Sequence, residues 1–255
     1  MSIVADQMAA WLRQQVAAAA AKGIVVGLSG GVDSAVVARV AQLAMGDAVL
    51  GVIMPAGSDP RDAQDARLVA KRFTLQVVEV DLSVAFDGLI GIIQQALVSQ
   101  PGDGAPAAEE PRRLALANVK PRLRMTVLYA VANRLNYIVA GTGNRSEIAI
   151  GYYTKYGDGG VDVLPLGALV KSEVYALARE LDVPSGIVTK APSAGLWRGQ
   201  TDEGEMGFTY ADLERFLREG PTAVAPAVRT RIESLVRASD HKRRMPPVFE
   251  PAPSE

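Results

Sequence analysis

The chain has 255 residues, 49% of them hydrophobic and 22% charged, which is enough to bury one large core, so we expect a single domain over residues 1–255. Because it contains no cysteine, disulfide bonds, thiolate-bound zinc and a cysteine nucleophile are excluded, and a cytoplasmic location is expected. A formal net charge of −1 favours a small-molecule substrate over a nucleic acid, and no apolar run reaches the roughly 20 residues that span a membrane.

The N-terminal part of the sequence alternates between helix and strand patterns. An alanine-rich stretch within residues 1–22 is typical of an amphipathic surface helix rather than of a signal peptide. Short β-branched runs then alternate with segments that repeat apolar residues at helical spacing. These patterns predict strands at 24–28, 48–54 and 75–80, and helices at 32–45, 61–73 and 83–99.

The same alternation continues in the second part of the sequence. A stretch rich in glycine and proline at 100–111 predicts a surface loop, and the proline-rich tail at 246–255 is expected to be loose. The remaining patterns predict helices at 112–135, 171–181, 210–219 and 223–239, and a strand at 137–140. Such alternation predicts a single α/β domain with a mostly parallel, twisted sheet and helices on both of its faces.

A glycine-rich turn, Ser29–Ser34, joins the first expected strand to the helix that follows it. Ligands of open parallel sheets lie beyond the carboxyl ends of the strands, which is where this turn falls. Gly30 and Gly31 allow the backbone to approach a phosphate closely. The N–H groups that open the helix, together with the Ser29 and Ser34 hydroxyls, can donate to its oxygens. The turn is therefore a candidate phosphate site.

Asp33 is the most informative residue of this turn. A carboxylate beside a phosphate repels it unless a cation lies between them, so Asp33 predicts a magnesium ion bridging to a nucleotide. The turn has neither the Gly-Lys-Ser/Thr of the common kinase-type phosphate loop nor the glycine spacing of the dinucleotide fingerprint. The alternative interpretation is a capped glycine turn without a ligand.

A second polar segment, residues 141–160, follows the strand expected at 137–140 and should face the same edge of the sheet. Its many charged residues and glycines favour a binding site, and the alternative is a capped helix followed by a solvated glycine turn. The candidate ligands in and just after it are Thr142 for the nucleotide, Glu147 for a second magnesium contact, and Lys155, Asp158 and Asp162 for a polar substrate.

The turn Ser29–Ser34 resembles the pyrophosphate loop of the ATP pyrophosphatase superfamily, whose members cleave ATP to adenylate an oxygen. Segments 118–124, 141–160, 190–203 and 241–243 resemble the matching segments of the ammonia-dependent NAD synthetases, and the similarity runs over about residues 27–247. The resemblance implies an adenine nucleotide alpha hydrolase-like, Rossmann-like fold. Pro121 departs from the alanine that is frequent there, and the short segment Pro55–Pro60 makes contacts with the adenine uncertain.

Carried over position by position, the resemblance implies three sets of site residues. Magnesium would be bound by Asp33 and Glu147. ATP would be contacted by Gly27, Leu28, Ser29, Gly30, Gly31, Val32, Asp33, Ser34, Thr142, Lys171 and Ser193. Deamido-NAD would be contacted by Arg122, Lys155, Asp162, His241 and Lys242. The family also implies a homodimer in which one subunit helps to bind the dinucleotide of the other.

The resulting hypothesis is an amide ligase that makes NAD from deamido-NAD, ATP and ammonia. The nicotinate carboxylate would be adenylated with release of pyrophosphate, ammonia would attack the acyl adenylate, and Asp158 would accept a proton from the incoming ammonium. Free ammonia is expected because the chain has no cysteine and no room for a glutaminase domain. The alternatives are another adenylating amidotransferase, a tRNA-modifying enzyme, and a nucleotide sensor without chemistry.

Overall fold

The computed structural model describes residues 3–97, 109–193, 195 and 200–251. Its centre is a sheet of four parallel strands: β1 (Gly23–Gly27), β2 (Val49–Ile53), β3 (Gln76–Glu79) and β4 (Tyr137–Ala140). The strand order is β3-β2-β1-β4, so the chain winds outward from β1 to one side and returns to its other side with β4. The crevice between the loops after β1 and β4 is where ligands of such sheets bind.

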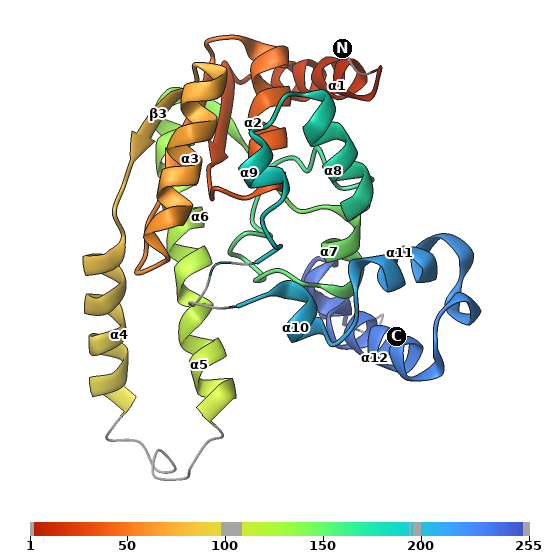
Figure 1. Ribbon diagram of the computed structural model, residues 1–255. Helices are drawn as coiled ribbons and strands as arrows, with labels where there is room; N and C mark the ends of the chain where they lie inside the picture. Colours follow the sequence, from red (N-terminus) through yellow and green to blue (C-terminus); the bar gives the residue numbers. More distant parts are fainter. Residues whose placement is uncertain (1–2, 98–108, 194, 196–199, 252–255) are drawn as a thin grey trace.

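Side chains alternate between the two faces of β1, and each face is covered by helices (Figure 1). Ile24 and Val26 point into the larger core, which is completed by α1 (Ile3–Ala18), α2 (Val32–Met45), α3 (Pro60–Phe73) and α8 (Lys171–Glu180). Val25 points the other way, into a smaller core under α6 (Val119–Leu135). The predicted α/β fold with a parallel, two-sided sheet is confirmed.

The long helix predicted at 112–135 is two helices, and this prediction was wrong in that respect. α5 (Glu109–Ala117) starts inside the loop that was predicted at 100–111, and α6 begins after Asn118. Proline has no N–H and its ring collides with the carbonyl four residues earlier, so Pro121 interrupts the hydrogen bonding at this point. Residues 100–108 of the predicted loop lie outside the described residues.

Near β3, α4 (Ser83–Leu97) precedes the undescribed segment and stands beside α6 (Figure 1). The C-terminal part then forms a separate helical cluster: α7 (Arg145–Ile150), α10 (Asp202–Met206), α11 (Tyr210–Glu219) and α12 (Pro226–Ala238) pack around Leu213 and Ile232. α9 (Ser185–Val188) and two 3-10 turns, Pro221–Ala223 and Asp240–Lys242, complete the described elements.

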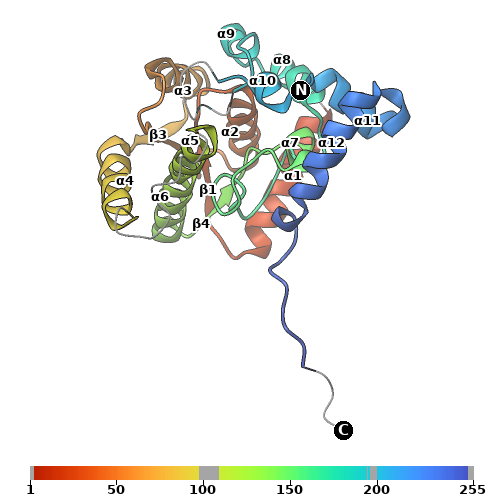
Figure 2. The same ribbon diagram turned by 90° about the horizontal axis from the view of Figure 1, so that it is seen from below.

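Residues 246–251 form neither helix nor strand and extend away from the body (Figure 2), and residues 252–255 of the tail predicted at 246–255 are outside the described part. Among the residues that the structure describes, no helix combines the length and the apolar character that crossing a bilayer requires.

Candidate active site

The turn after β1 is held in a conformation that exposes the start of α2. Gly30 has a φ of +80°, and a Cβ atom there would lie 2.3 Å from the carbonyl oxygen of Asp62 on α3, so only glycine fits. Gly31 caps α2 with an extended backbone. The Ser34 hydroxyl donates to the Gly31 carbonyl oxygen at 2.9 Å and accepts from the Ser29 N–H at 3.3 Å. The turn is thus braced from within, with the N-terminal end of α2 facing the cleft.

Two carboxylates from the first turns of α2 and α7 meet at one buried lysine. The ammonium of Lys171, at the start of α8, lies 2.5 Å from Asp33 Oδ2 and 3.4 Å from Glu147 Oε1. Only 4% of the lysine side chain is exposed, against 17% of each carboxylate. Asn144 links the two helix starts, since its side-chain amide donates to Asp33 Oδ1 at 2.9 Å and its Oδ1 accepts from the Glu147 N–H.

The charges of this cluster are strongly coupled. Burial, followed by the nearby Asp33 carboxylate, raises the pKa of Glu147 from 4.5 to about 8. Burial alone would lower the pKa of Lys171, but the two carboxylates outweigh it and raise that pKa. The lysine therefore stays charged and neutralises part of a site whose carboxylates repel each other.

These groups line a cavity of about 770 Å³, a size typical of sites for small molecules. It lies between the loops after β1, β2 and β4 and the segment that follows α9. Twelve of the predicted site residues line it: Gly27, Leu28, Ser29, Gly31, Val32, Asp33, Thr142, Glu147, Asp158, Lys171, Ser193 and Lys242. The candidate phosphate-binding turn, two carboxylates and a cavity of nucleotide size meet at the switch point of a parallel sheet, which makes this cleft the candidate active site.

A family model described as NAD synthase matches residues 4–246. This chain belongs to the NAD synthase family. It is 51% identical over 243 residues to the NH(3)-dependent NAD(+) synthetase of Carboxydothermus hydrogenoformans, with 95% of each chain covered. The family resemblance predicted from the sequence is confirmed.

Two solved structures extend the comparison. The NMN synthetase from Francisella tularensis is 36% identical, with a TM-score of 0.87 over 96% of this chain and 97% of that one. The NH3-dependent NAD synthetase from Campylobacter jejuni is 27% identical, with a TM-score of 0.74 over 98% of this chain and 100% of that one.

Not all predicted residues of this NAD synthase family member reach the cleft. Gly30 packs against the carbonyl oxygen of Asp62, and the Ser34 hydroxyl bonds to the backbone of the turn, so neither residue lines the cavity. Both oxygens of Asp162 are occupied, Oδ1 by the Tyr129 hydroxyl at 2.9 Å and Oδ2 by the Val139 N–H at 2.8 Å, so this carboxylate holds strand β4. Arg122 is exposed on α6 and does not itself line the cavity, although it donates to the carbonyl oxygen of Asn118, which does. The contacts of Gly30 and Ser34 with ATP, and those of Asp162 and Arg122 with deamido-NAD, remain predictions.

The basic C-terminal segment is tied to the loop after α7. Lys242 donates to the carbonyl oxygens of Gly151 at 2.7 Å and Tyr153 at 2.6 Å, and its ammonium lies 5.2 Å from the centre of the Tyr153 ring. Lys155 donates to the carbonyl oxygen of His241 at 2.6 Å, whereas the His241 side chain is exposed. In this arrangement both lysines donate hydrogen bonds to backbone carbonyl oxygens of the chain itself.

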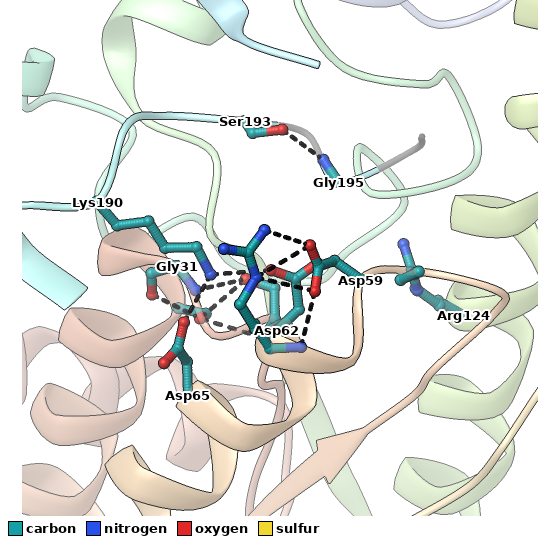
Figure 3. A network of polar contacts seen from close by, with 12 residues as sticks. Gly31, Asp59, Asp62, Asp65, Arg124, Lys190, Ser193 and Gly195 are labelled. Atoms are coloured by element: carbon teal, nitrogen blue, oxygen red, sulfur yellow. Dashed lines mark hydrogen bonds and ion pairs between the residues drawn. The ribbon is translucent and has the colours of Figure 1, made fainter. Parts of the chain in front are cut away.

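Sequence reasoning assigned no role to three polar residues of this site. Asn144 caps α7 together with Glu147, and the spacing Asn-x-x-Glu could have revealed it. Arg124 donates to the Met54 carbonyl oxygen and to the Ser58 hydroxyl, a contact across the sheet edge that no local pattern signals. Lys190 forms ion pairs with Asp62 and Asp65 at the mouth of the cleft (Figure 3).

Proposed function

We propose that this chain joins ammonia to the nicotinate carboxylate of deamido-NAD at the expense of ATP, giving NAD, AMP and pyrophosphate. The observation that carries the proposal is the convergence of Asp33 and Glu147 on Lys171 beside the phosphate-binding turn. Relatives named NH(3)-dependent NAD(+) synthetase, of which this chain covers 95% and 94%, support it.

The residues present fit a magnesium ion. Asp33 and Glu147 supply hard carboxylate oxygens directed at a common point, where the positive charge of Lys171 now lies, and magnesium prefers such oxygen ligands. Among the described residues no group of three or more acidic, histidine or cysteine side chains is placed to hold a metal, so phosphate oxygens and water would complete the shell. Bound there, the ion would neutralise phosphate charge during adenylation.

The residues of the chain then divide the work. The N–H groups at the start of α2 and the Ser29 hydroxyl would bind phosphate oxygens and place the α-phosphate for attack by the nicotinate carboxylate. Lys171 would stabilise the negative charge that develops as pyrophosphate leaves. Asp158, whose Oδ1 is fixed by the Thr154 N–H at 2.9 Å, would accept the proton that ammonium loses before it attacks the acyl adenylate.

We further propose that the chain forms a homodimer through the surface around α4. The helix carries the sequence SVAFDGLIGIIQQAL but buries none of its residues, and Val84 and Ile92 are 86% and 67% exposed. The edge strand β3 next to it is exposed along its whole length. Exposed apolar side chains on a helix beside an exposed sheet edge are typical of a protein interface.

The homodimer is tested by light scattering on Ile92→Lys. We expect the wild type at twice the chain mass and the variant at the mass of one chain, because the interface would have to bury a charge. Ile3→Lys, at an equally exposed apolar position of α1 on another side of the molecule, is the matched control and should stay dimeric. A wild type of single-chain mass would contradict the proposal.

The substrate is tested by incubating the protein with ATP, magnesium and deamido-NAD, with either ammonium or glutamine, and following products by chromatography. We expect NAD and AMP in equal amounts from ammonium, and none from glutamine. The similarity to the NMN synthetase from Francisella tularensis makes the carboxylate precursor of NMN the competing acceptor. Faster amidation of that mononucleotide than of deamido-NAD would overturn the proposed substrate.

A further inference from the structure

Lys190 follows α9 and crosses to the first two turns of α3. Its ammonium lies 2.9 Å from Asp62 Oδ1 and 2.6 Å from Asp65 Oδ2, and about a third of its side chain is exposed. In the close-up the lysine side chain reaches both carboxylates from the segment after α9 (Figure 3). Nothing in the proposed reaction so far uses this charge.

The carboxylates that hold Lys190 belong to the helix against which the phosphate-binding turn is packed. The carbonyl oxygen of Asp62 stands directly behind Gly30, at 2.3 Å from where a Cβ would be. Lys190, Asp62 and Gly31 all line the same cavity. Lys190 is therefore held on the helix that supports the turn, and it lines the same cavity as the turn does.

Of the four other cations that line the described part of the cleft, Arg67 forms an exposed ion pair with Glu79, and the remaining three are engaged more firmly. Lys171 is buried between Asp33 and Glu147, Lys242 holds two backbone carbonyl oxygens, and Arg124 holds a carbonyl oxygen and a serine hydroxyl. Lys190 is held by partly exposed carboxylates alone, and ion pairs of that kind contribute little to stability because solvent screens them. Release of Lys190 to another anion therefore costs little.

We propose that Lys190 is a second polyphosphate-binding residue of the site, which exchanges Asp62 and Asp65 for the β- and γ-phosphate oxygens of ATP. The turn Ser29–Ser34 has no lysine of its own, so Lys190 supplies the cation that kinase-type loops carry within their sequence. After adenylation the lysine stays with the departing pyrophosphate. The inference rests on the proposed use of ATP.

The two carboxylates act as competitors in this scheme. They keep Lys190 beside the turn in the free protein, and they oppose the binding of the polyphosphate that must take the lysine from them. If Lys190 served only to hold the segment after α9 against α3, the result would differ. Removing either the lysine or its two carboxylates would then weaken ligand binding. The sign of the effect of removing the carboxylates separates these two roles.

The first arm measures binding of α,β-methylene-ATP, pyrophosphate and AMP to Lys190→Met by calorimetry in the presence of magnesium. We expect the methylene analogue and pyrophosphate to bind about tenfold more weakly than to the wild type, the loss typical of one charge-assisted hydrogen bond, and AMP to bind within twofold. Lys71→Met, an exposed lysine in the last turn of α3, is the matched control and should bind all three ligands like the wild type. Unchanged pyrophosphate binding in Lys190→Met would overturn the proposal.

The second arm uses the double variant Asp62→Asn, Asp65→Asn, which keeps the shape of both side chains. We expect it to bind the methylene analogue at least as tightly as the wild type, and weaker binding would overturn the proposal. This arm decides alone if Lys190→Met does not fold. NAD formation by the wild-type preparation is measured in parallel: absence of NAD refutes the proposed function, whereas NAD formation with unchanged binding in the variants refutes only the role of Lys190.

Discussion

The two walls of the cleft are held by different kinds of contact. At the ends of β1 and β4, Asp33, Glu147 and Lys171 bind one another, and their positions are fixed by helix starts and by a buried asparagine. On the opposite wall, the loop at 151–162 is held by Lys155 and Lys242, which donate to backbone carbonyl oxygens. The charged side chains of the first wall face the cavity, whereas the lysines of the second wall hydrogen-bond to the backbone of the chain. After the ligands proposed for them, we call the first the nucleotide wall and the second the dinucleotide wall.

This difference indicates that a single chain completes the proposed ATP-binding part of the site, but not the part predicted to bind deamido-NAD. The nucleotide wall is built from the ends of two neighbouring strands, so the sheet itself positions it. Of the residues predicted for deamido-NAD only Lys242 lines the cavity. The exposed Arg122 and His241 need a ligand or a second subunit to be engaged, which agrees with the proposed dimer. Substitutions on the two walls should therefore separate ATP chemistry from dinucleotide binding.

The largest effect is expected on the nucleotide wall, from Asp33→Asn. The amide keeps the shape but removes one of the two carboxylates that fit magnesium, so NAD formation should fall by about 10³-fold. Release of AMP and NAD, measured by chromatography, should fall together, because the change affects adenylation. Asp47→Asn, at the exposed end of the segment after α2, is the control and should keep full activity. An Asp33→Asn enzyme that retained a tenth of the wild-type rate would contradict the assignment.

The next effect concerns folding stability of the same wall. Lys171→Met leaves Asp33 and Glu147 buried together without a cation, which should lower the free energy of unfolding by about 3 kcal/mol in metal-free buffer. Urea denaturation measures this loss, and Lys22→Met at an exposed position is the control.

The loss in Lys171→Met should depend on pH in a defined direction. The pKa of Glu147 is already raised from 4.5 to about 8 in the folded protein, so this group destabilises the fold progressively as pH rises from 4.5 to 8. Without the lysine that pKa rises further. The wild type and the variant therefore lose stability in parallel up to about pH 8, and the penalty of the variant should grow above that pH, where only the wild-type Glu147 is ionised. A penalty that shrank with rising pH would show that the two carboxylates are not coupled through Lys171.

On the opposite wall, Gly151→Ala should cost about 2 kcal/mol of unfolding free energy, from a left-handed backbone and a collision together. Gly151 has a φ of +66°, and a Cβ would lie 2.1 Å from the Cβ of Ser239. Gly207→Ala separates the two causes, since Gly207 has a φ of +83° but nothing within 4 Å of its Cβ position, and it should cost about 1 kcal/mol. Equal costs in urea denaturation would show that the end of α12 moves aside.

The sequence predicted the elements best where local signals were strong. The bounds 32–45, 137–140 and 210–219 agree with α2, β4 and α11, because a glycine turn, a β-branched run and a threonine cap mark them. α9 and α10 were not predicted, and α7 was foreseen only as the capped helix of the alternative interpretation of residues 141–160, since four to six residues are too few to show a helical period. The helix at 223–239 was predicted to start three residues early, before the Pro226 that opens α12.

Site residues could be predicted from the sequence where a local motif fixes their position relative to the sheet. The turn Ser29–Ser34 and Glu147 follow parallel strands, so their meeting at one edge could be predicted. Arg124 and Lys190 could not, because each acts through partners more than 60 residues away in the sequence. Asp162 shows the opposite difficulty: a charged residue in a promising segment that is committed to holding β4. The individual ligand contacts remain predictions.

The smallest effect is expected from Lys242→Met on the opposite wall. This variant tests whether that wall contributes to binding of deamido-NAD alone. Lys242→Met removes the ammonium that holds the carbonyl oxygens of Gly151 and Tyr153, while the methionine can still pack against the Tyr153 ring. The KM for deamido-NAD should rise about tenfold, the loss of one charge-assisted contact, with the KM for ATP unchanged. Arg244→Met, an exposed neighbour paired with Asp240, should alter neither value. If both KM values rose together in Lys242→Met, the two walls would be one cooperative unit, and the division between a preformed nucleotide wall and a ligand-dependent dinucleotide wall would fall.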